Sequence, residues 1–331
     1  MDIRLEEINT WLQTDLNISN YSIEPASADA SFRRYFRIIL DNDQGKSLII
    51  MDAPPSKEDC APFIDITNRL LKSGINAPEI KAFSAENGFL LLSDLGNTMY
   101  LDKLNEENAD ELYHAAINSL ITMQSHTSTA ELPQYNEALL HQEMSLFSDW
   151  LLNKHLGLPT QDSWLQNTFS FLSQSALEQP QVFVHRDYHS RNLTWQHDQS
   201  PGVLDFQDAV LGPISYDLVS ILRDCYIKWP SDHLVNWVTY YCDTVRQNDL
   251  LPNFSQAEFT RWFDLMGIQR HLKASGIFAR LYHRDDKKGY LKDIPRTLSY
   301  IEEVSQKYSE LNELNRFINQ SLQPALKDIK T

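Results

Sequence analysis

A polar loop in the second half of the chain carries the residue types that phosphoryl transfer requires. The loop runs from His185 to Asn192 and contains Asp187, and Asp205 follows shortly afterwards. One carboxylate can accept the proton of an attacking hydroxyl, while an amide oxygen and a second carboxylate hold a divalent cation. Mg²⁺ prefers such oxygen ligands. We therefore predict that Asp187 is the catalytic base and that Asn192 and Asp205 bind Mg²⁺.

The segments on both sides of this loop predict how it is positioned. Residues 182–184 are typical of a buried strand that leads into the loop. Residues 193–195 and 202–204 predict a short hairpin that returns Asp205 beside the loop. Asp217, at the start of a predicted helix, is interpreted as a cap that also anchors the loop. The alternative is a polar loop with satisfied carboxylates and no catalytic role, and the flanking strands weigh against it.

Residues 185–192, 203–208 and 212–218 together resemble the catalytic block of the aminoglycoside phosphotransferase superfamily. The resemblance covers nearly the whole chain. It implies an α+β, bilobal, protein-kinase-like fold, with a small β-rich N-lobe and a larger, mostly helical C-lobe. It also implies ATP and Mg²⁺ as cofactors.

Two N-terminal stretches, residues 25–37 and 51–55, narrow the resemblance. They are similar to the anomeric sugar kinases of bacterial cell-wall (peptidoglycan) recycling. That similarity implies ATP-dependent phosphorylation of the anomeric hydroxyl of N-acetylmuramate or N-acetylglucosamine, giving the sugar 1-phosphate.

Two alternatives stay open. The first is another small-molecule kinase of the superfamily, acting on an aminoglycoside, choline or homoserine. The second is a catalytically inactive nucleotide-binding protein. The third predicted strand, residues 48–52, lacks the lysine that kinase-like folds usually carry there, which favours the second alternative. The presence of a base together with two metal ligands opposes it.

Charge, apolar runs and cysteine spacing disfavour several other classes of protein. The 331 residues include 29 basic and 45 acidic side chains, a net charge of −16, which disfavours binding to nucleic acid or to anionic membranes. The charged N-terminus lacks a signal-peptide core, and no apolar run reaches membrane-spanning length. Three widely spaced cysteines indicate reduced thiols. We expect a cytoplasmic protein with a small-molecule sugar substrate, and the sequence does not indicate its oligomeric state.

The order of predicted elements fits two lobes. Residues 1–95 are predicted as a nucleotide-binding N-lobe, residues 93–97 as a hinge, and residues 98–331 as a catalytic and acceptor-binding C-lobe. A first helix carries apolar residues from Leu5 to Leu16 on one face. The other elements expected in the N-lobe are strands at 21–25, 32–40, 47–51, 81–85 and 89–92, and a helix that ends before Gly74.

Two segments of the N-lobe are candidate nucleotide contacts. The small residues of the loop 27–31, with Ser31 at its end, let backbone N–H groups approach phosphates, although a simple β-turn is equally compatible. Ser93, Asp94 and Leu95 occupy the inter-lobe link, where the resembled fold binds adenine through its backbone. A plain turn is the alternative for that link.

Kinase-like folds usually use the third-strand lysine to hold phosphate oxygens, so another cation must replace it here. We predict that Arg34 takes this role. Strand alternation places Phe32, Arg34 and Phe36 on one face. An arginine among apolar neighbours on a buried face needs an anionic partner. The partner is a nucleotide phosphate in the functional interpretation, or Asp52 or Asp65 in the structural one.

The acceptor side offers weaker candidates. Asp208 can accept hydrogen bonds from sugar hydroxyls or cap the following turn. His189 and Arg191 lie between the predicted base and the metal ligand. Arg191 can contact the transferred phosphoryl group, and His189 can contact the acceptor or brace the loop. The resemblance also places Arg223 and Arg270 on helices around the acceptor pocket, where a muramate carboxylate would favour an arginine. Bracing of helices is the alternative role for both arginines.

Overall fold

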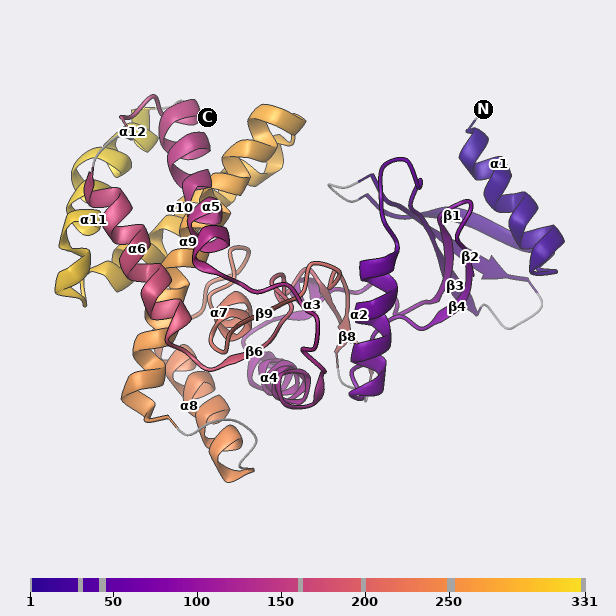
Figure 1. Ribbon diagram of the computed structural model, residues 1–331, viewed down its shortest axis with the longest axis horizontal. Helices are drawn as coiled ribbons and strands as arrows, with labels where there is room; N and C mark the ends of the chain where they lie inside the picture. The colour runs from indigo at the N-terminus through magenta and orange to yellow at the C-terminus, as the bar shows by residue number, and fades with distance from the viewer. Residues whose placement is uncertain are drawn as a thin grey trace. The chain divides into compact units, whose positions relative to one another are not determined.

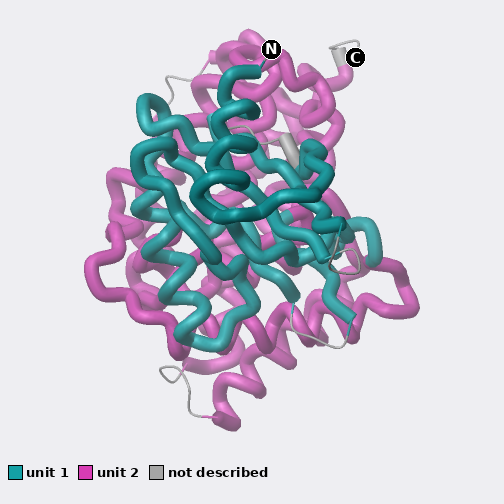
Figure 2. Tube along the Cα trace, turned by 90° about the vertical axis from the view of Figure 1, so that its right-hand side faces the viewer, with its two compact units in different colours: residues 1–103, 192–208 teal, residues 104–191, 209–331 magenta. Residues whose placement is uncertain are grey.

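The computed structural model describes residues 2–28, 32–41, 46–159, 163–197, 201–248 and 254–328. The chain forms two compact units (Figure 2). Unit 1 comprises residues 1–103 and 192–208, and unit 2 comprises residues 104–191 and 209–331. Unit 1 therefore includes the hairpin of residues 192–208, which follows the predicted catalytic loop. The sequence predicted this hairpin to belong to the C-lobe. The functional boundary near residues 93–97 stays a prediction.

A five-stranded antiparallel sheet forms the centre of unit 1, with strand order β1-β2-β3-β5-β4 (Figure 1). Alternating apolar residues and short polar turns favour such a sheet over a parallel one. The β-strands are β1 (Tyr21–Ala28), β2 (Arg34–Leu40), β3 (Ser47–Asp52), β4 (Ile80–Ser84) and β5 (Phe89–Ser93).

The helix α1 (Ile3–Thr10) continues into a π-helical turn (Trp11–Asp15) and covers one face of this sheet. Ile8 and Trp11 pack in one cluster with Phe36 of β2. Phe32 departs from the prediction: it precedes β2 and is 63% exposed. The alternation that we extended to Phe32 fails because the strand begins two residues later.

The helix α2 (Ala61–Lys72) has an apolar face that includes Phe63 and Leu70. It ends where predicted, because Gly74 adopts a left-handed conformation with φ of 85° that glycine tolerates best. The chain returns to unit 1 as a short hairpin of β7 (Leu193–Thr194) and β8 (Gly202–Val203). That hairpin brings Phe206 to Phe63, with ring centres 5.1 Å apart.

Unit 2 is mostly helical and is organised around one long helix, α9 (Gln256–Asp285) (Figure 1). Gly276 of α9 allows a close crossing: an added Cβ would lie 2.2 Å from the backbone of Leu146. Between its helices lies the antiparallel pair of β6 (Gln181–Val184) and β9 (Val210–Pro213). The α-helices around these elements are α4 (Ala109–His126), α5 (Glu137–Leu146), α6 (Ser163–Leu177), α7 (Tyr216–Leu222), α8 (Ser231–Gln247), α10 (Ile294–Ser305), α11 (Asn312–Phe317) and α12 (Gln323–Asp328).

A short helix, α3 (Tyr100–Lys103), closes the first segment of unit 1. Further π-helical and 3₁₀ segments in unit 2 are Phe147–His155, Lys288–Asp293, Ser309–Leu311 and Ile318–Leu322. Within the described residues, none of the helices has the length and apolar character needed to cross a membrane.

Candidate active site

The loop that follows β6 is fixed at its start by a buried carboxylate. The backbone N–H groups of His185 and Arg186 donate to the two carboxylate oxygens of Asp217, at 2.7 and 3.1 Å. Burial raises the pKa of Asp217 to about 7, although these two donors work against the rise. The predicted anchoring role is confirmed. The predicted capping role is wrong, because Ser215 occupies the cap position of α7 and Asp217 lies in its first turn.

Arg186 has a backbone conformation that L-residues rarely adopt, with φ of 76°. Such a conformation costs a non-glycine residue about 1–2 kcal/mol, so its surroundings must hold it. Its guanidinium pairs with Glu143, a buried carboxylate on α5 that also pairs with Lys273 at 2.9 Å. Burial works to raise the pKa of Glu143, but Lys273 and Arg186 outweigh it and lower that pKa, so Glu143 stays charged.

Asp187 comes directly after this strained residue, and hydrogen bonds fix its backbone on both sides. Its N–H donates to His185 Nδ1 at 3.2 Å, and its carbonyl accepts from the N–H of His189 at 3.0 Å. Burial acts to raise the pKa of the Asp187 carboxyl, but Lys273, the two histidines and Arg270 lower it below its ordinary value. Asp187 is therefore ionised at neutral pH, as a proton acceptor must be.

A second buried carboxylate fixes the other end of the loop. Asp224 accepts from the N–H and the hydroxyl of Ser190, at 2.9 and 2.5 Å, and from the N–H of Tyr226 at 2.9 Å. The loop that carries Asp187 is thus held at one end by Asp217 and at the other by Asp224.

Sequence analysis missed Asp224, Glu143 and Lys273. Each is charged, yet each lies within or directly after an apolar helical segment and is buried. That placement was a usable signal, because a charge at a buried helical position needs a partner. The sequence could not say which partner.

His189, predicted to contact the acceptor or brace the loop, and Arg191, predicted to contact the phosphoryl group, lie against the same tyrosine. The His189 ring is nearly perpendicular to the Tyr226 ring, with centres 5.4 Å apart. Burial lowers the pKa of His189, so its ring is neutral at pH 7. Arg191 is exposed, and its guanidinium carbon lies 4.6 Å from the centre of the Tyr226 ring. Both side chains belong to unit 2, as Asp187 does.

Arg223 and Arg270 are both buried in unit 2, but they differ in their partners. Arg223 pairs with Asp264 at 2.5 Å, which agrees with the bracing interpretation. Arg270 donates from Nη1 to the Cys225 thiol at 3.7 Å. Cys225 directly follows Asp224, so Arg270 contacts the segment that anchors the catalytic loop.

The two predicted metal ligands are neighbours in unit 1. Asn192 Nδ2 lies 3.2 Å from Asp205 Oδ2, and Gln207 Nε2 donates to Asp205 Oδ1 at 2.8 Å. Asp205 has φ of 64°, a conformation that aspartate tolerates better than most residues. The described residues hold no cluster of three or more His, Cys, Asp or Glu side chains suited to a metal. An amide beside a carboxylate still fits Mg²⁺, which commonly uses one or two protein ligands together with phosphates and water.

Asp208, the other acceptor candidate, is exposed and ends the second segment of unit 1. Its role in sugar binding or in capping the turn stays a prediction. Ser31, the predicted phosphate-loop residue, lies outside the described residues.

The link between the predicted lobes, residues 93–97, is fixed by hydrogen bonds and one ion pair to other parts of unit 1. Asp94 pairs with Arg37 of β2 at 2.6 Å and accepts from the Gly96 N–H at 2.9 Å. The Ser93 hydroxyl accepts from the backbone N–H of Glu79 at 2.8 Å. The Leu95 carbonyl accepts from the Gln196 side chain. A nucleotide that bonds to the Leu95 carbonyl therefore competes with Gln196.

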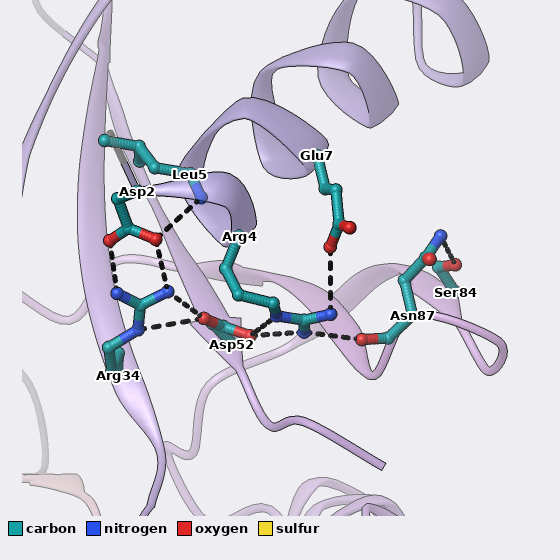
Figure 3. Close-up of polar contacts among 8 residues, drawn as sticks. All are labelled: Asp2, Arg4, Leu5, Glu7, Arg34, Asp52, Ser84 and Asn87. Carbon is teal, nitrogen blue, oxygen red and sulfur yellow. Dashed lines mark hydrogen bonds and ion pairs between the residues drawn. The ribbon is translucent and has the colours of Figure 1, made fainter. Parts of the chain in front are cut away.

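Arg34 has the anionic partners that its position requires, and they are carboxylates (Figure 3). It donates to Asp52 Oδ2 from Nε at 3.0 Å and from Nη2 at 2.6 Å, and it also pairs with Asp2. Arg4 of α1 binds the other oxygen of Asp52. These contacts tie α1 to the sheet and agree with the structural interpretation of Arg34.

Comparison with known proteins decides the family. A family model described as a phosphotransferase enzyme family matches residues 22–251. The N-acetylmuramate/N-acetylglucosamine kinase of Pseudomonas putida is 43% identical and is aligned over 96% of each chain. The kinase of the same name from Neisseria meningitidis is 41% identical over 92% of each chain.

The chain belongs to the phosphotransferase enzyme family. The predicted membership and the predicted class of enzyme are thereby confirmed. Within this family, the fixed loop around Asp187 and the pair of Asn192 with Asp205 are the candidate machinery.

Solved structures confirm the predicted α+β, protein-kinase-like fold. A choline kinase from Streptococcus pneumoniae has a TM-score of 0.64 and 12% identity, covering 90% of this chain and 99% of that chain. An ADP-bound aminoglycoside phosphotransferase has a TM-score of 0.59 and 13% identity, covering 89% and 97%. At such identities the likeness concerns the fold of this phosphotransferase and not its acceptor.

Proposed function

We propose that this phosphotransferase uses ATP to phosphorylate the anomeric hydroxyl of N-acetylmuramate and N-acetylglucosamine. The observation that carries the proposal is identity of 41–44% to three proteins named as kinases of these two sugars, over 92–96% of the chain. The products are sugar 1-phosphates. From the resemblance of residues 25–37 and 51–55, we also propose a cytoplasmic role in cell-wall recycling.

Asp187 accepts the proton of the attacking hydroxyl. Its carboxylate is ionised and its backbone is fixed by hydrogen bonds on both sides. A carboxylate of low pKa is sufficient here, because proton loss need not precede formation of the phosphorus–oxygen bond in a loose transition state. Four residues separate Asp187 from Asn192 in the sequence, which supports their action in one reaction.

Asn192 and Asp205 hold Mg²⁺, and Gln207 orients the Asp205 carboxylate. The bound ion neutralises charge on the nucleotide phosphates. The proposal rests on the 3.2 Å distance between Asn192 Nδ2 and Asp205 Oδ2, and on the oxygen atoms that both side chains can offer to a metal ion.

Residues 1–95 bind the nucleotide, with adenine at the link 93–97. We place the nucleotide on the sheet face opposite α1, because α1 and its carboxylates already cover the face that carries Arg34. Arg34 therefore joins α1 to the sheet. Ser31 remains a predicted phosphate contact.

The charges around the loop favour a neutral or anionic acceptor over a cationic one. Arg270 and Lys273 lower the pKa of Asp187 from the same unit, and Arg191 follows in the loop. A cationic acceptor such as choline needs carboxylates or aromatic rings in place of such cations. These positive charges favour a sugar as the acceptor over choline or an aminoglycoside.

The test is an acceptor screen with ATP and Mg²⁺, followed by phosphorus NMR of the product. We expect phosphorylation of both sugars, with a product that acid hydrolyses readily, as glycosyl 1-phosphates do. An acid-stable product would reject the anomeric position. Nucleotide consumption with choline but with neither sugar would reject the proposal altogether.

A further inference from the structure

Arg270 is a buried cation of unit 2. It lies in the middle of α9, with 6% of its surface exposed. Among the residues that the structure describes, its side chain bonds to the Cys225 thiol at 3.7 Å and forms no ion pair. A guanidinium stays protonated in proteins, so a buried one calls for an anion.

Three other cations of unit 2 have carboxylate partners. Arg186 and Lys273 share the Glu143 carboxylate, and Lys273 also lies 3.0 Å from the Tyr216 hydroxyl. Arg223 pairs with Asp264. Arg270 differs from all three, because no carboxylate among the described residues forms an ion pair with it. Asp224 and Asp187 act on its charge only at longer range.

The position of Arg270 points to the acceptor side of the catalytic loop. Cys225, its hydrogen-bond partner, lies between Asp224, which holds Ser190, and Tyr226, which contacts the His189 ring. The charge of Arg270 also acts on Asp187 and on His189. An anion that binds Arg270 would therefore belong to a molecule bound beside Asp187.

Chemistry identifies this anion. N-acetylmuramate and N-acetylglucosamine share the same ring, but only N-acetylmuramate carries a lactyl ether with a carboxylate. An arginine binds a carboxylate through two parallel hydrogen bonds, which suits a single buried guanidinium. The phosphates of the nucleotide are the other anions of the reaction, and the Mg²⁺ proposed to neutralise them is held by Asn192 and Asp205 of unit 1.

We propose that Arg270 binds the lactyl carboxylate of N-acetylmuramate and makes the enzyme prefer this sugar over N-acetylglucosamine. This inference rests on the proposed sugar kinase function. N-acetylglucosamine leaves Arg270 without an anion, so it binds more weakly although it reacts by the same chemistry.

The test compares kcat/KM for the two sugars in the wild type and in Arg270→Met, at pH 8 and saturating ATP. Methionine keeps much of the side-chain volume and removes the charge. We expect kcat/KM for N-acetylmuramate to fall by roughly 10- to 100-fold, the usual range for charged hydrogen bonds, and mainly through KM. We expect kcat/KM for N-acetylglucosamine to change by less than about threefold, which is below the effect of one such bond.

Arg223→Met is the matched control, because Arg223 is equally buried but paired with Asp264. Its variant should leave the ratio of the two kcat/KM values unchanged, even if both values fall. An equal loss for both sugars in Arg270→Met would overturn the inference and would assign Arg270 to the support of the loop. An unchanged ratio would overturn it as well.

The methyl ester of N-acetylmuramate supplies a test that needs no variant. The wild type should use this neutral ester as poorly as Arg270→Met uses the acid, and Arg270→Met should not distinguish ester from acid. If Arg270→Met does not fold, equal use of ester and acid by the wild type overturns the inference. A wild type that phosphorylates neither sugar would instead refute the proposed function, and the inference with it.

Discussion

Asp187 stays ionised because its neighbours outweigh its burial. Lys273 is the largest of these influences, and it is itself held by Glu143. The ionisation of the base therefore depends on Glu143, which acts through Lys273. His185 adds to this by accepting the Asp187 N–H, which fixes the direction of the backbone.

Replacing Asp187 by asparagine should remove the proton acceptor while keeping its shape. We expect kcat to fall by about 10²- to 10⁴-fold, the range typical of general bases, while nucleotide affinity changes little. Steady-state kinetics and a separate nucleotide titration check the two parts. Turnover close to that of the wild type would remove Asp187 from the mechanism.

The variant Asp205→Ala tests whether Asp205 is a ligand of Mg²⁺. We expect the variant to lose the gain in nucleotide affinity that Mg²⁺ gives to the wild type, because one of two protein ligands is missing. Nucleotide titrations with and without Mg²⁺ measure this directly, without relying on turnover. Asp208→Ala, three residues away and exposed, is the control and should keep the Mg²⁺-dependent gain. A Mg²⁺-dependent gain retained by Asp205→Ala would exclude Asp205 as a ligand.

At the scale of elements, Glu143 joins α5 and α9 to the catalytic loop. It pairs with Lys273 of α9 and with Arg186, whose strained backbone leads into Asp187. Tyr135 donates its hydroxyl to the same carboxylate. One buried anion thus fixes two helices and the loop in a single arrangement.

Glu143→Gln should destabilise the fold at neutral pH by about 3–5 kcal/mol, because it leaves the buried Lys273 and the partly buried Arg186 without an anion. The pKa of Glu143 is lowered in the folded state, so its contribution is present above the ordinary pKa of glutamate, 4.5, and is lost as pH falls below it. Urea unfolding of both proteins at pH 7 and pH 3.5 should show the difference shrinking at low pH. An equal difference at both values would mean that ionic pairing is not its cause.

The elements show how far the sequence could be read. Alternation and turn residues predicted the strands of the sheet to within a few residues, and Gly74 predicted the end of α2, because these signals are local. Arg34 shows the limit. Its need for an anion was predictable from its buried face, but the choice of Asp2 and Asp52 depends on where α1 packs. Asp224 and Lys273 were missed for the same reason, since side-chain partners are set by tertiary packing.

At the scale of the whole molecule, unit 1 is discontinuous in sequence. The hairpin 192–208 returns to it and bonds to three points of the first segment. Val203 donates to the Asn76 carbonyl at 2.8 Å, Trp195 donates to the Thr98 carbonyl at 2.8 Å, and Gln196 binds Leu95. The proposed metal ligands therefore belong to the same compact unit as the proposed adenine link, although about a hundred residues of chain separate them.

This discontinuity predicts how fragments behave. Residues 1–103 alone lack Val203 and Phe206, which are fully buried, and each such side chain contributes roughly 1.5–3 kcal/mol on burial. We expect this fragment to melt at a lower temperature and less cooperatively than residues 1–103 joined to 192–208 by a short glycine-serine linker.

The joined form also carries Asn192 and Asp205, so it should bind Mg²⁺ and ATP weakly while showing no kinase activity, because Asp187 is absent. Circular dichroism melting and nucleotide titration measure both properties. Equal melting of the two fragments would mean that the hairpin contributes nothing to unit 1, and Mg²⁺-dependent nucleotide binding by residues 1–103 alone would move the metal site away from Asn192 and Asp205.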